Sequence, residues 1–277
     1  MGSATKHPRP PAVVLLGGKG TRIAGTFPDR PKALVPVLDR PFLEWQLDCL
    51  ATWGFTRIIL AAGHMADRLS DWLDFSLPER FRVLGISLSV EPAPLGTAGA
   101  LLHALPQIPQ EAPRLFAVNG DTLFPALDTA RLDAILGKID ASPPDAAHLF
   151  VAPIEKPDRY GTVEFDGESG RVTAFREKHP VPSGFVNAGG YLFPVASLRN
   201  LLPLASDSPL SMERDVFPAL VVSRTLYAHP IPPPLLDMGT PEGLAALSGF
   251  LDAARHAKRA EDGSEFVHPR STGDRKI

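Results

Sequence analysis

The chain has 277 residues, of which 44% are hydrophobic, and its 28 basic and 31 acidic side chains leave a formal net charge of −3. A chain of this size can bury one large core or two smaller ones. The near balance of charge argues against a nucleic-acid track, and no apolar run approaches the ~20 residues that span a bilayer. The single cysteine, Cys49, permits no internal disulfide, which suits the cytoplasm. We therefore expect a cytoplasmic protein that binds neither nucleic acid nor membrane.

The two ends of the chain differ in composition from its middle. Residues 1–11 lack the apolar core of a signal peptide, and the tail from Asp252 is rich in charge and poor in apolar residues. We expect flexible termini at 1–11 and 252–277, with a frayed helix at the start of the tail. We expect the segment between them to form a single domain with two halves rather than two separate domains.

The first 140 residues alternate short apolar runs with segments of helical periodicity. Continuous apolar runs are typical of parallel strands covered on both faces. The pattern predicts an α/β fold with a doubly wound, mostly parallel sheet, whose ligands bind at the carboxyl ends of the strands. We expect strands at 12–17, 56–62, 83–90 and 114–119, and helices from Pro41 to Gly54, from Met65 to Leu73 and from Thr97 to Ala104.

Beyond residue 145 the pattern changes to shorter strand-like runs separated by turn residues. We expect a strand at 148–153, a hairpin of 162–165 and 171–175 about Asp166-Gly167, a strand at 185–193, and helices at 195–202 and 211–221.

The loop after the first apolar run is the most informative stretch of the chain. It contains Gly17, Gly18 and Gly20 within four positions and then the two cations Arg22 and Lys32. Glycines let a backbone approach a ligand closely and point its N–H groups inward, as phosphate recognition requires. Arg22 can grip two oxygens at once, whereas Lys32 acts as a mobile point charge. The loop therefore favours a nucleoside triphosphate.

Two common phosphate motifs do not fit this loop. The Walker pattern requires Ser or Thr after its Gly-Lys, and here Lys19 is followed by Gly20. The dinucleotide fingerprint requires a glycine three residues after Gly20, and that position is Ile23. A glycine-rich turn with incidental surface cations is the plain alternative, and the fixed order Thr21-Arg22 and Pro31-Lys32 argues against it.

With the motifs that follow it, this loop resembles the opening of the sugar nucleotidyltransferases. The resemblance covers roughly residues 12–248 and is closest to D-glycero-D-manno-heptose 1-phosphate guanylyltransferases. The chain departs from the family pattern at Ile23 and Gly25, where members often have Leu and Pro. The matching motifs, in order, are Glu91-Pro92, Leu95-Gly96-Thr97-Ala98-Gly99, Asn119-Gly120-Asp121, Arg159-Tyr160-Gly161-Thr162-Val163, Phe175-Arg176-Glu177-Lys178, Asn187-Ala188-Gly189-Gly190, Ser211-Met212-Glu213-Arg214-Asp215 and Asp237-Met238-Gly239-Thr240-Pro241-Glu242.

The resemblance implies a Rossmann-like fold of the glycosyltransferase-A type, with a nucleotide-binding half at 12–140 and a sugar-binding lobe at 145–248. It also implies transfer of a nucleotidyl group, in which the sugar 1-phosphate attacks the α-phosphorus and pyrophosphate leaves. Such a reaction depends on positioning and on charge neutralisation by cations and Mg²⁺. By this resemblance we expect Arg22, Lys32, Asp121 and Lys178 to be catalytic.

Two aspartates are candidates for the magnesium site. Asp121 follows a predicted strand at its carboxyl end, where a parallel sheet presents ligands, although an Asx turn or helix cap is the plain alternative. Asp237 could cap the helix that begins near Pro241, but Thr240 is better placed for that role. The resemblance implies that both aspartates share Mg²⁺, which binds few carboxylates together with phosphate and water. The eight histidines are scattered without ligand-like spacing.

The resemblance also implies the residues that contact the sugar. Glu177 would bind sugar hydroxyls and Lys178 the sugar phosphate, while Gly161 would contact the sugar through its backbone and Asn187 through its amide. The residues alone leave plain alternatives open: a Glu-Lys pair is usually a solvated edge, and the glycines after Asn187 could mark a bulged strand.

The base pocket is expected at Glu91, where the expected strand 83–90 ends. A carboxylate can accept from both the N1–H and the 2-amino group of guanine, which favours guanine over adenine. It excludes uracil less well, because uracil also offers an N3–H. Gly96 and Thr97 would close the pocket through backbone and hydroxyl contacts. The nucleotide-binding residues are therefore expected to be Gly17, Gly18, Gly20, Thr21, Arg22, Glu91, Gly96, Thr97 and Gly120.

The predicted function is Mg²⁺-dependent transfer of a guanylyl group from GTP to a sugar 1-phosphate, with D-glycero-D-manno-heptose 1-phosphate favoured. One alternative is a uridylyl- or thymidylyltransferase that acts on a hexose, amino-sugar or cyclitol 1-phosphate. The other is a non-catalytic nucleotide-sensing subunit. Loss of either aspartate or of Arg22 would support the sensor, and all three residues are present. From the habit of the family alone, we also expect a homodimer.

Overall fold

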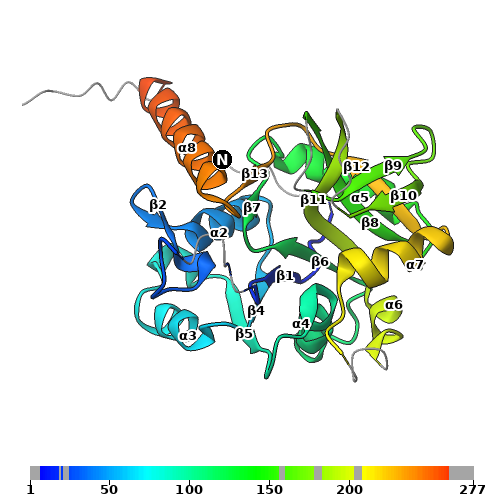
Figure 1. Cartoon of the computed structure of the whole chain (residues 1–277), viewed down its shortest axis with the longest axis horizontal. Helices are drawn as coiled ribbons and strands as arrows, with labels where there is room; N and C mark the ends of the chain where they lie inside the picture. Colours follow the sequence, from blue (N-terminus) through cyan, green and yellow to red (C-terminus); the bar gives the residue numbers. More distant parts are fainter. Residues whose placement is uncertain are drawn as a thin grey trace, which may run out of the picture.

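The computed structural model describes residues 7–18, 20, 25–155, 160–177, 183–202 and 208–261, with side chains up to 257. Its centre is a nine-stranded mixed sheet in which the strand order is β10-β9-β11-β6-β1-β4-β5, while β8 pairs with β11 and β12 (Figure 1). Four of these strands are parallel neighbours and come from the first half of the chain. They are β1 (Ala12–Leu15), β4 (Arg57–Ala62), β5 (Gly85–Val90) and β6 (Arg114–Asn119).

Helices cover both faces of the parallel strands, because neighbouring strand residues point to opposite sides. Val14 belongs to the core cluster that α2 (Phe42–Thr52), α3 (Ala66–Phe75) and α5 (Thr129–Asp140) cover. Its neighbour Val13 belongs to the cluster on the other face, which α4 (Gly96–Ala104) covers. The predicted α/β architecture is confirmed, and the expected strands and helices of this half occur within a few residues of their predicted bounds.

The second half of the chain extends the same sheet with mainly antiparallel pairing. Its central strand, β11 (Ser183–Pro194), pairs antiparallel with β6, β8 (Ala147–Glu155) and β9 (Thr162–Phe165). The sheet is therefore shared between the two halves, and its antiparallel part goes beyond the mostly parallel sheet predicted. The remaining elements of this half are β10 (Val172–Arg176), α6 (Val195–Arg199), the π-helical turn η5 (Met212–Val216), α7 (Phe217–Val222) and β12 (Leu226–Pro230).

Short elements connect these layers. A two-stranded sheet joins β7 (Thr122–Leu123) to β13 (Leu236–Asp237), and another joins β2 (Pro36–Val37) to β3 (Arg40–Pro41). Three 3₁₀ turns complete the described elements: η1 (Lys32–Leu34), η2 (Glu79–Phe81) and η3 (Leu105–Gln107).

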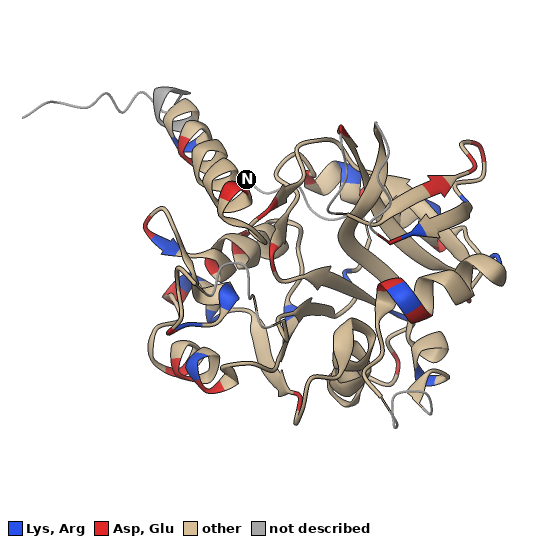
Figure 2. Ribbon diagram, viewed as in Figure 1, with Lys and Arg blue, Asp and Glu red and all other residues tan. Residues whose placement is uncertain are grey.

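The last helix, α8 (Pro241–Glu261), packs at its start and projects from the body of the molecule at its end (Figure 1). Leu247 and Leu251 are buried in a third core cluster with Phe42 and Met238. Within the part of the chain that the structure describes, no helix combines the length and apolarity needed to cross a membrane. Figure 2 shows basic and acidic residues interspersed over the described helices and loops.

Part of the amino-terminal lead-in, predicted to be flexible, is packed. Arg9 forms an ion pair with Asp133 at 2.6 Å, and their side chains are 3% and 9% exposed. Its Nε also donates to the Trp53 carbonyl at 2.5 Å. The lack of an apolar run led to the prediction of flexibility here, but an arginine with a buried carboxylate partner is held in place without one.

Candidate functional site

Asp121 and Asp237 are carried by the small sheet of β7 and β13. Asp237 lies opposite Thr122, the residue after Asp121, and the Met238 N–H donates to the Asp121 carbonyl at 3.0 Å. On the other side, the Gly120 N–H donates to the Leu15 carbonyl at 3.0 Å. Segments more than 100 residues apart in the sequence therefore bring the two predicted metal ligands onto neighbouring backbones at the end of β6.

Both aspartates already have partners. Lys32 Nζ lies 2.5 Å from Asp121 Oδ2, with the two side chains 18% and 33% exposed. The Thr122 hydroxyl donates to Asp121 Oδ1 at 3.0 Å, and the Gly239 N–H donates to Asp237 Oδ1 at 2.5 Å. The predicted cation Lys32 and the predicted metal ligand Asp121 are therefore in direct contact.

The donor set suits magnesium better than a transition metal. Among the described residues, no group of three or more His, Cys, Asp or Glu side chains could hold a metal ion. Magnesium commonly binds through one or two carboxylates and completes its shell with water and substrate phosphate. A site of two neighbouring aspartates fits that requirement.

The glycine-rich loop lies next to Lys32, the partner of Asp121. Gly20 has a positive φ of 57°, and a Cβ built on it would lie 3.3 Å from the Lys32 Cβ. A Cβ on Gly18 would meet nothing within 4 Å, so its backbone borders open space. Thr21 and Arg22, from the same loop, and Lys178, predicted for the sugar phosphate, lie outside the described residues.

Glu91 directly follows β5 and lies in a pocket of about 220 Å³ lined by residues 17, 63–64 and 91–94. Its Oε2 accepts from the Leu95 N–H at 3.1 Å. A Cβ on Gly17 or Gly63 would lie 2.6 Å or 2.2 Å from Glu91 Oε1, so only glycine leaves room for the carboxylate. Burial raises the pKa of this carboxyl. Gly63 was not predicted, and its place after a buried strand was the available signal.

Gly96 and Thr97 connect α4 to the second half of the chain. Gly96 has φ +79°, and a Cβ there would lie 2.5 Å from the Leu210 carbonyl oxygen. The Thr97 hydroxyl donates to Glu213 Oε2 at 3.0 Å and accepts from the Met212 N–H at 2.8 Å. The structure therefore assigns this hydroxyl to a contact with the π-helical turn η5, a partner that the sequence reasoning did not consider.

Three predicted sugar-binding residues lie together. The Asn187 N–H donates to the Gly161 carbonyl at 2.9 Å, and a Cβ on Gly161 would lie 3.2 Å from Glu177 Oε2. The Asn187 amide has internal partners as well, because Nδ2 donates to the Tyr191 hydroxyl at 3.0 Å and Oδ1 accepts from the Gly189 N–H at 2.9 Å. The side chain is thereby fixed in one orientation.

Tyr191 links this cluster to the aspartate loop. Its hydroxyl donates to Asn119 Oδ1 at 3.4 Å, and Asn119 ends β6 just before Gly120-Asp121. The side chain is fully buried, and burial raises its pKa well above the ordinary value, so the phenol stays protonated. An aromatic residue inside a strand gave no sequence signal for this role.

A larger cavity of about 630 Å³ lies elsewhere, beside Pro11, Thr56 and Pro113 at the amino ends of β1, β4 and β6. Ligands of open α/β sheets bind at the carboxyl ends of strands, which is where the aspartates, the Glu91 pocket and the glycine loop are found. The chemistry of the side chains therefore outweighs cavity size in locating the site.

Comparisons with known proteins find relatives in both sequence and structure. The sequence family described as Nucleotidyl transferase matches residues 11–253. Mannose-1-phosphate guanyltransferase beta-B of Xenopus laevis is 33% identical over 251 residues, which cover 88% of this chain and 66% of that protein. The beta-A protein of the same species is 33% identical over 264 residues, covering 92% and 69%. The chain thus spans about two thirds of the length of these relatives.

Solved structures give a similar result. HddC from Yersinia pseudotuberculosis superposes with a TM-score of 0.71 at 26% identity, covering 87% of this chain and 99% of that one. The same protein complexed with GMP-PN gives a TM-score of 0.68. A putative glucose-1-phosphate thymidylyltransferase from Bacillus anthracis, in complex with a sucrose, gives 0.72 over 87% and 94% of the chains. Its 20% identity supports the fold alone.

Proposed function

The chain belongs to the nucleotidyl transferase family, and from this premise we propose that it transfers a guanylyl group from GTP to a sugar 1-phosphate. The products are a GDP-sugar and pyrophosphate. The observation that carries the proposal is the contact of Lys32 with Asp121 beside the strand of Asp237, at the carboxyl ends of the strands, where the Glu91 pocket also lies. The names of the guanyltransferase relatives support the choice of GTP.

Asp121 and Asp237 would hold Mg²⁺, which when bound neutralises phosphate charge and orients the triphosphate. Lys32 is paired with Asp121 in this structure. Once the aspartate binds the metal, Lys32 would turn to the phosphate oxygens of the triphosphate and neutralise their charge. Arg22 and Lys178 complete the proposed set of cations, Arg22 on the triphosphate and Lys178 on the sugar phosphate. These residues position the two substrates and neutralise phosphate charge, and the reaction requires no side-chain nucleophile.

Glu91 would select the base. Its carboxylate is held by the Leu95 N–H on one oxygen, while the other lies against Gly17 and Gly63. Guanine offers two adjacent donors, N1–H and the 2-amino group, which match the acceptor-only chemistry of a carboxylate. Uracil offers one such donor, so UTP is the competing substrate. The other proposed nucleotide contacts are the glycine loop, Gly120, Gly96 and Thr97.

The sugar would bind in the second half, against Gly161, Glu177 and Asn187. The mutual contacts of these residues support the proposal, as does the link through Tyr191 to Asn119, two residues before Asp121. D-glycero-D-manno-heptose 1-phosphate is the favoured sugar from the motif resemblance. Mannose 1-phosphate is the second candidate, because the names of the sequence relatives contain it.

The test is pyrophosphate release with Mg²⁺, with GTP, UTP, dTTP, ATP and CTP each paired with heptose, mannose, glucose and amino-sugar 1-phosphates. Activity with GTP and heptose or mannose 1-phosphate supports the proposal. Activity with UTP and an amino sugar would keep the reaction and overturn the substrate. If no pair reacts while GTP still raises the melting temperature, the nucleotide-sensing alternative takes its place.

A further inference from the structure

Gln46 is a polar residue in the buried face of α2. It is 2% exposed, and its sequence neighbour Leu47 belongs to the main core cluster, as does Leu43 one turn earlier. Its Nε2 donates to two backbone carbonyls, that of Asn119 at 2.7 Å and that of Thr122 at 3.2 Å. These carbonyls lie on either side of Gly120-Asp121. One side chain therefore binds both ends of the short segment that carries the proposed metal ligand.

The orientation of the Gln46 amide follows from its partners. Both are carbonyl oxygens, which only accept, so the NH₂ group must face them. The other end of the amide, Oε1, is buried and has no hydrogen-bond partner within the described part of the chain. A buried acceptor without a partner lowers stability, so an apolar side chain would suit the core better at this position. Stability alone therefore does not explain why this position holds an amide side chain, whereas the hydrogen bonds to the two carbonyls do.

We infer that Gln46 is a positioning residue for Asp121, and the inference rests on the proposed role of Asp121 as a metal ligand. The Asp121 segment is also held through the Gly120 N–H on Leu15 and the Met238 N–H on the Asp121 carbonyl. Those contacts act on the middle of the segment, whereas Gln46 fixes its two ends. Groups that orient metal ligands from outside the coordination shell commonly contribute ~10- to 100-fold to metal affinity or activity.

The test uses Mn²⁺ as a probe, with the free ion measured by electron paramagnetic resonance in the presence of a non-hydrolysable GTP analogue. Gln46→Met keeps the length and apolar fit of the side chain and removes both donors. Its Mn²⁺ affinity is expected to fall ~10- to 100-fold. Leu47→Met, a core change on the same helix away from the loop, is the matched control and should bind Mn²⁺ as the wild type does.

Gln46→Asn provides a second variant in case Gln46→Met does not fold. It keeps the amide but shortens the side chain, so one donor group no longer reaches both carbonyls, and a smaller loss of Mn²⁺ affinity is expected. Wild-type affinity in a folded Gln46 variant would overturn the inference and leave the proposed function standing. Equal, weak Mn²⁺ binding by the wild type and by Asp121→Asn would overturn the metal role and the inference together.

Discussion

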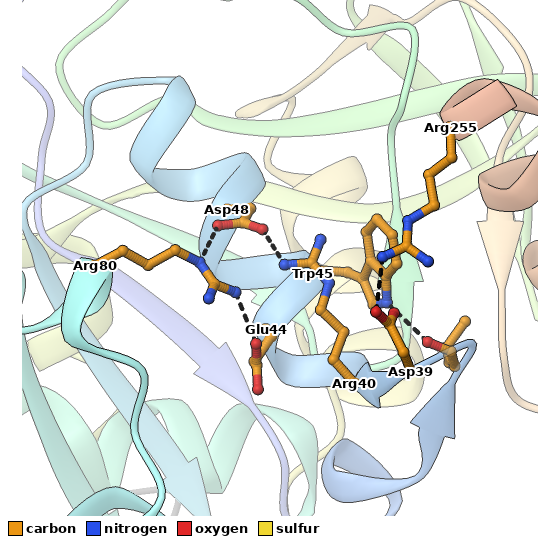
Figure 3. A network of polar contacts seen from close by, with 8 residues as sticks. Asp39, Arg40, Glu44, Trp45, Asp48, Arg80 and Arg255 are labelled. Carbon is orange, nitrogen blue, oxygen red and sulfur yellow. Dashed lines mark hydrogen bonds and ion pairs between the residues drawn. The ribbon is translucent and has the colours of Figure 1, made fainter. Parts of the chain in front are cut away.

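Helix α2 lies between two groups of charged residues that differ in how their charges are paired. On its outer side, Asp48 accepts from both Arg40 and Arg80, and Arg80 also donates to Glu44 at 2.7 Å (Figure 3). On its inner side, Gln46 faces the segment of Asp121, whose carboxylate pairs with one cation among the described residues, Lys32.

The outer network is redundant. Arg40 also stacks 3.6 Å above the Trp45 ring, and Arg255 of α8 lies 5.5 Å from the same ring while it pairs with Asp39 at 2.8 Å (Figure 3). Loss of one member leaves the others paired, which is typical of charges that tie elements together. Within the part of the chain that the structure describes, the pair of Asp121 and Lys32 has no such reserve. In the proposed function Asp121 would exchange Lys32 for a metal and Lys32 would turn to a phosphate, so the two sides of α2 are expected to differ in what the loss of one charge does.

The largest expected difference between the two sides of α2 is in the turnover of variants that each neutralise one aspartate. Asp121→Asn is expected to reduce turnover at least ~100-fold, the scale of losing a preorganised charge partner in a transition state. Asp48→Asn should leave turnover close to wild type, because Arg80 retains Glu44 and Arg40 retains the Trp45 ring. The measurement is pyrophosphate release at saturating Mg²⁺, with melting temperatures to show that both variants are folded.

Asp237→Asn belongs to the same test and should behave as Asp121→Asn does. Near-normal turnover in either variant would remove the metal assignment. A large loss of turnover in Asp48→Asn, with its melting temperature unchanged, would show that the outer network is not merely structural.

Glu91→Gln tests a carboxylate whose proposed role depends on its ability to accept two hydrogen bonds rather than on a cationic partner. Glutamine is similar in shape but presents a donor where guanine needs an acceptor. Hydrogen bonds to charged groups contribute ~1.5–3 kcal/mol, so the ratio of kcat/KM for GTP over UTP should fall roughly 10- to 100-fold. An unchanged ratio in steady-state kinetics would refute the role of Glu91 in base selection.

The pH dependence sharpens this prediction. Burial raises the pKa of Glu91, so the carboxylate becomes protonated at a higher pH than an exposed glutamate does. A protonated carboxyl can no longer accept from both guanine donors. We therefore expect kcat/KM for GTP to fall as the pH drops through this raised pKa, and Glu91→Gln to lack that acidic limb.

Much of the nucleotide-binding half could be predicted, because its information is local. Continuous apolar runs indicate the parallel strands, and the rule that ligands bind at their carboxyl ends places Glu91 and Asp121 at one edge. Periodicity also offers one signal that went unused, since Gln46 interrupts the apolar face formed by Leu43 and Leu47.

The second half was predicted less completely, because its organisation depends on long-range pairing. The hairpin and the strand around Asn187 were expected, but nothing local indicates that β11 pairs with β6 and joins the halves. The contact of Tyr191 with Asn119 spans 72 residues and that of Thr97 with Glu213 spans 116. A helix was predicted at 211–221, but its first turn is π-helical, a form without a distinct periodicity in five residues.

The buried His148 and its half-buried partner His229 extend the comparison to uncharged polar groups. Ser142 donates to the Ile139 carbonyl at 2.5 Å, so it accepts from His148 Nε2 at 3.0 Å, and His148 Nδ1 in turn accepts from His229 at 3.0 Å. This arrangement requires His148 to be neutral, because its Nδ1 must keep a lone pair to accept from His229. Burial, with the proximity of the other ring and of Arg114, lowers the pKa of His148 to about 3. Burial and Lys138 lower that of His229 to about 4.

These depressed pKa values predict acid sensitivity of the fold. Unfolded histidine binds a proton near pH 6.5, whereas in the folded state His229 does so only near pH 4 and His148 near pH 3, so the free energy of unfolding should fall as the pH drops from about 6.5 to 3. His148→Gln should flatten this decline by at least ~1.4 kcal/mol, the value of one pKa unit. Urea unfolding across this range measures it, and the exposed His103→Gln is the control. A decline as steep in His148→Gln as in the wild type would contradict the assignment.

Arg255→Ala tests the outer network where it is most exposed and should give the smallest effect. The Arg255 and Asp39 side chains are 44% and 63% exposed, so water and salt screen the pair. Exposed ion pairs contribute at most ~1 kcal/mol, and a loss of that size should shrink further in high salt. Leu247→Ala is the contrasting change on α8, since it removes a fully buried side chain and should cost ~2–5 kcal/mol regardless of salt. If Arg255→Ala instead lowered turnover at an unchanged melting temperature, α8 would be coupled to the site through Trp45 and α2, and the two sides of that helix could no longer be treated as independent.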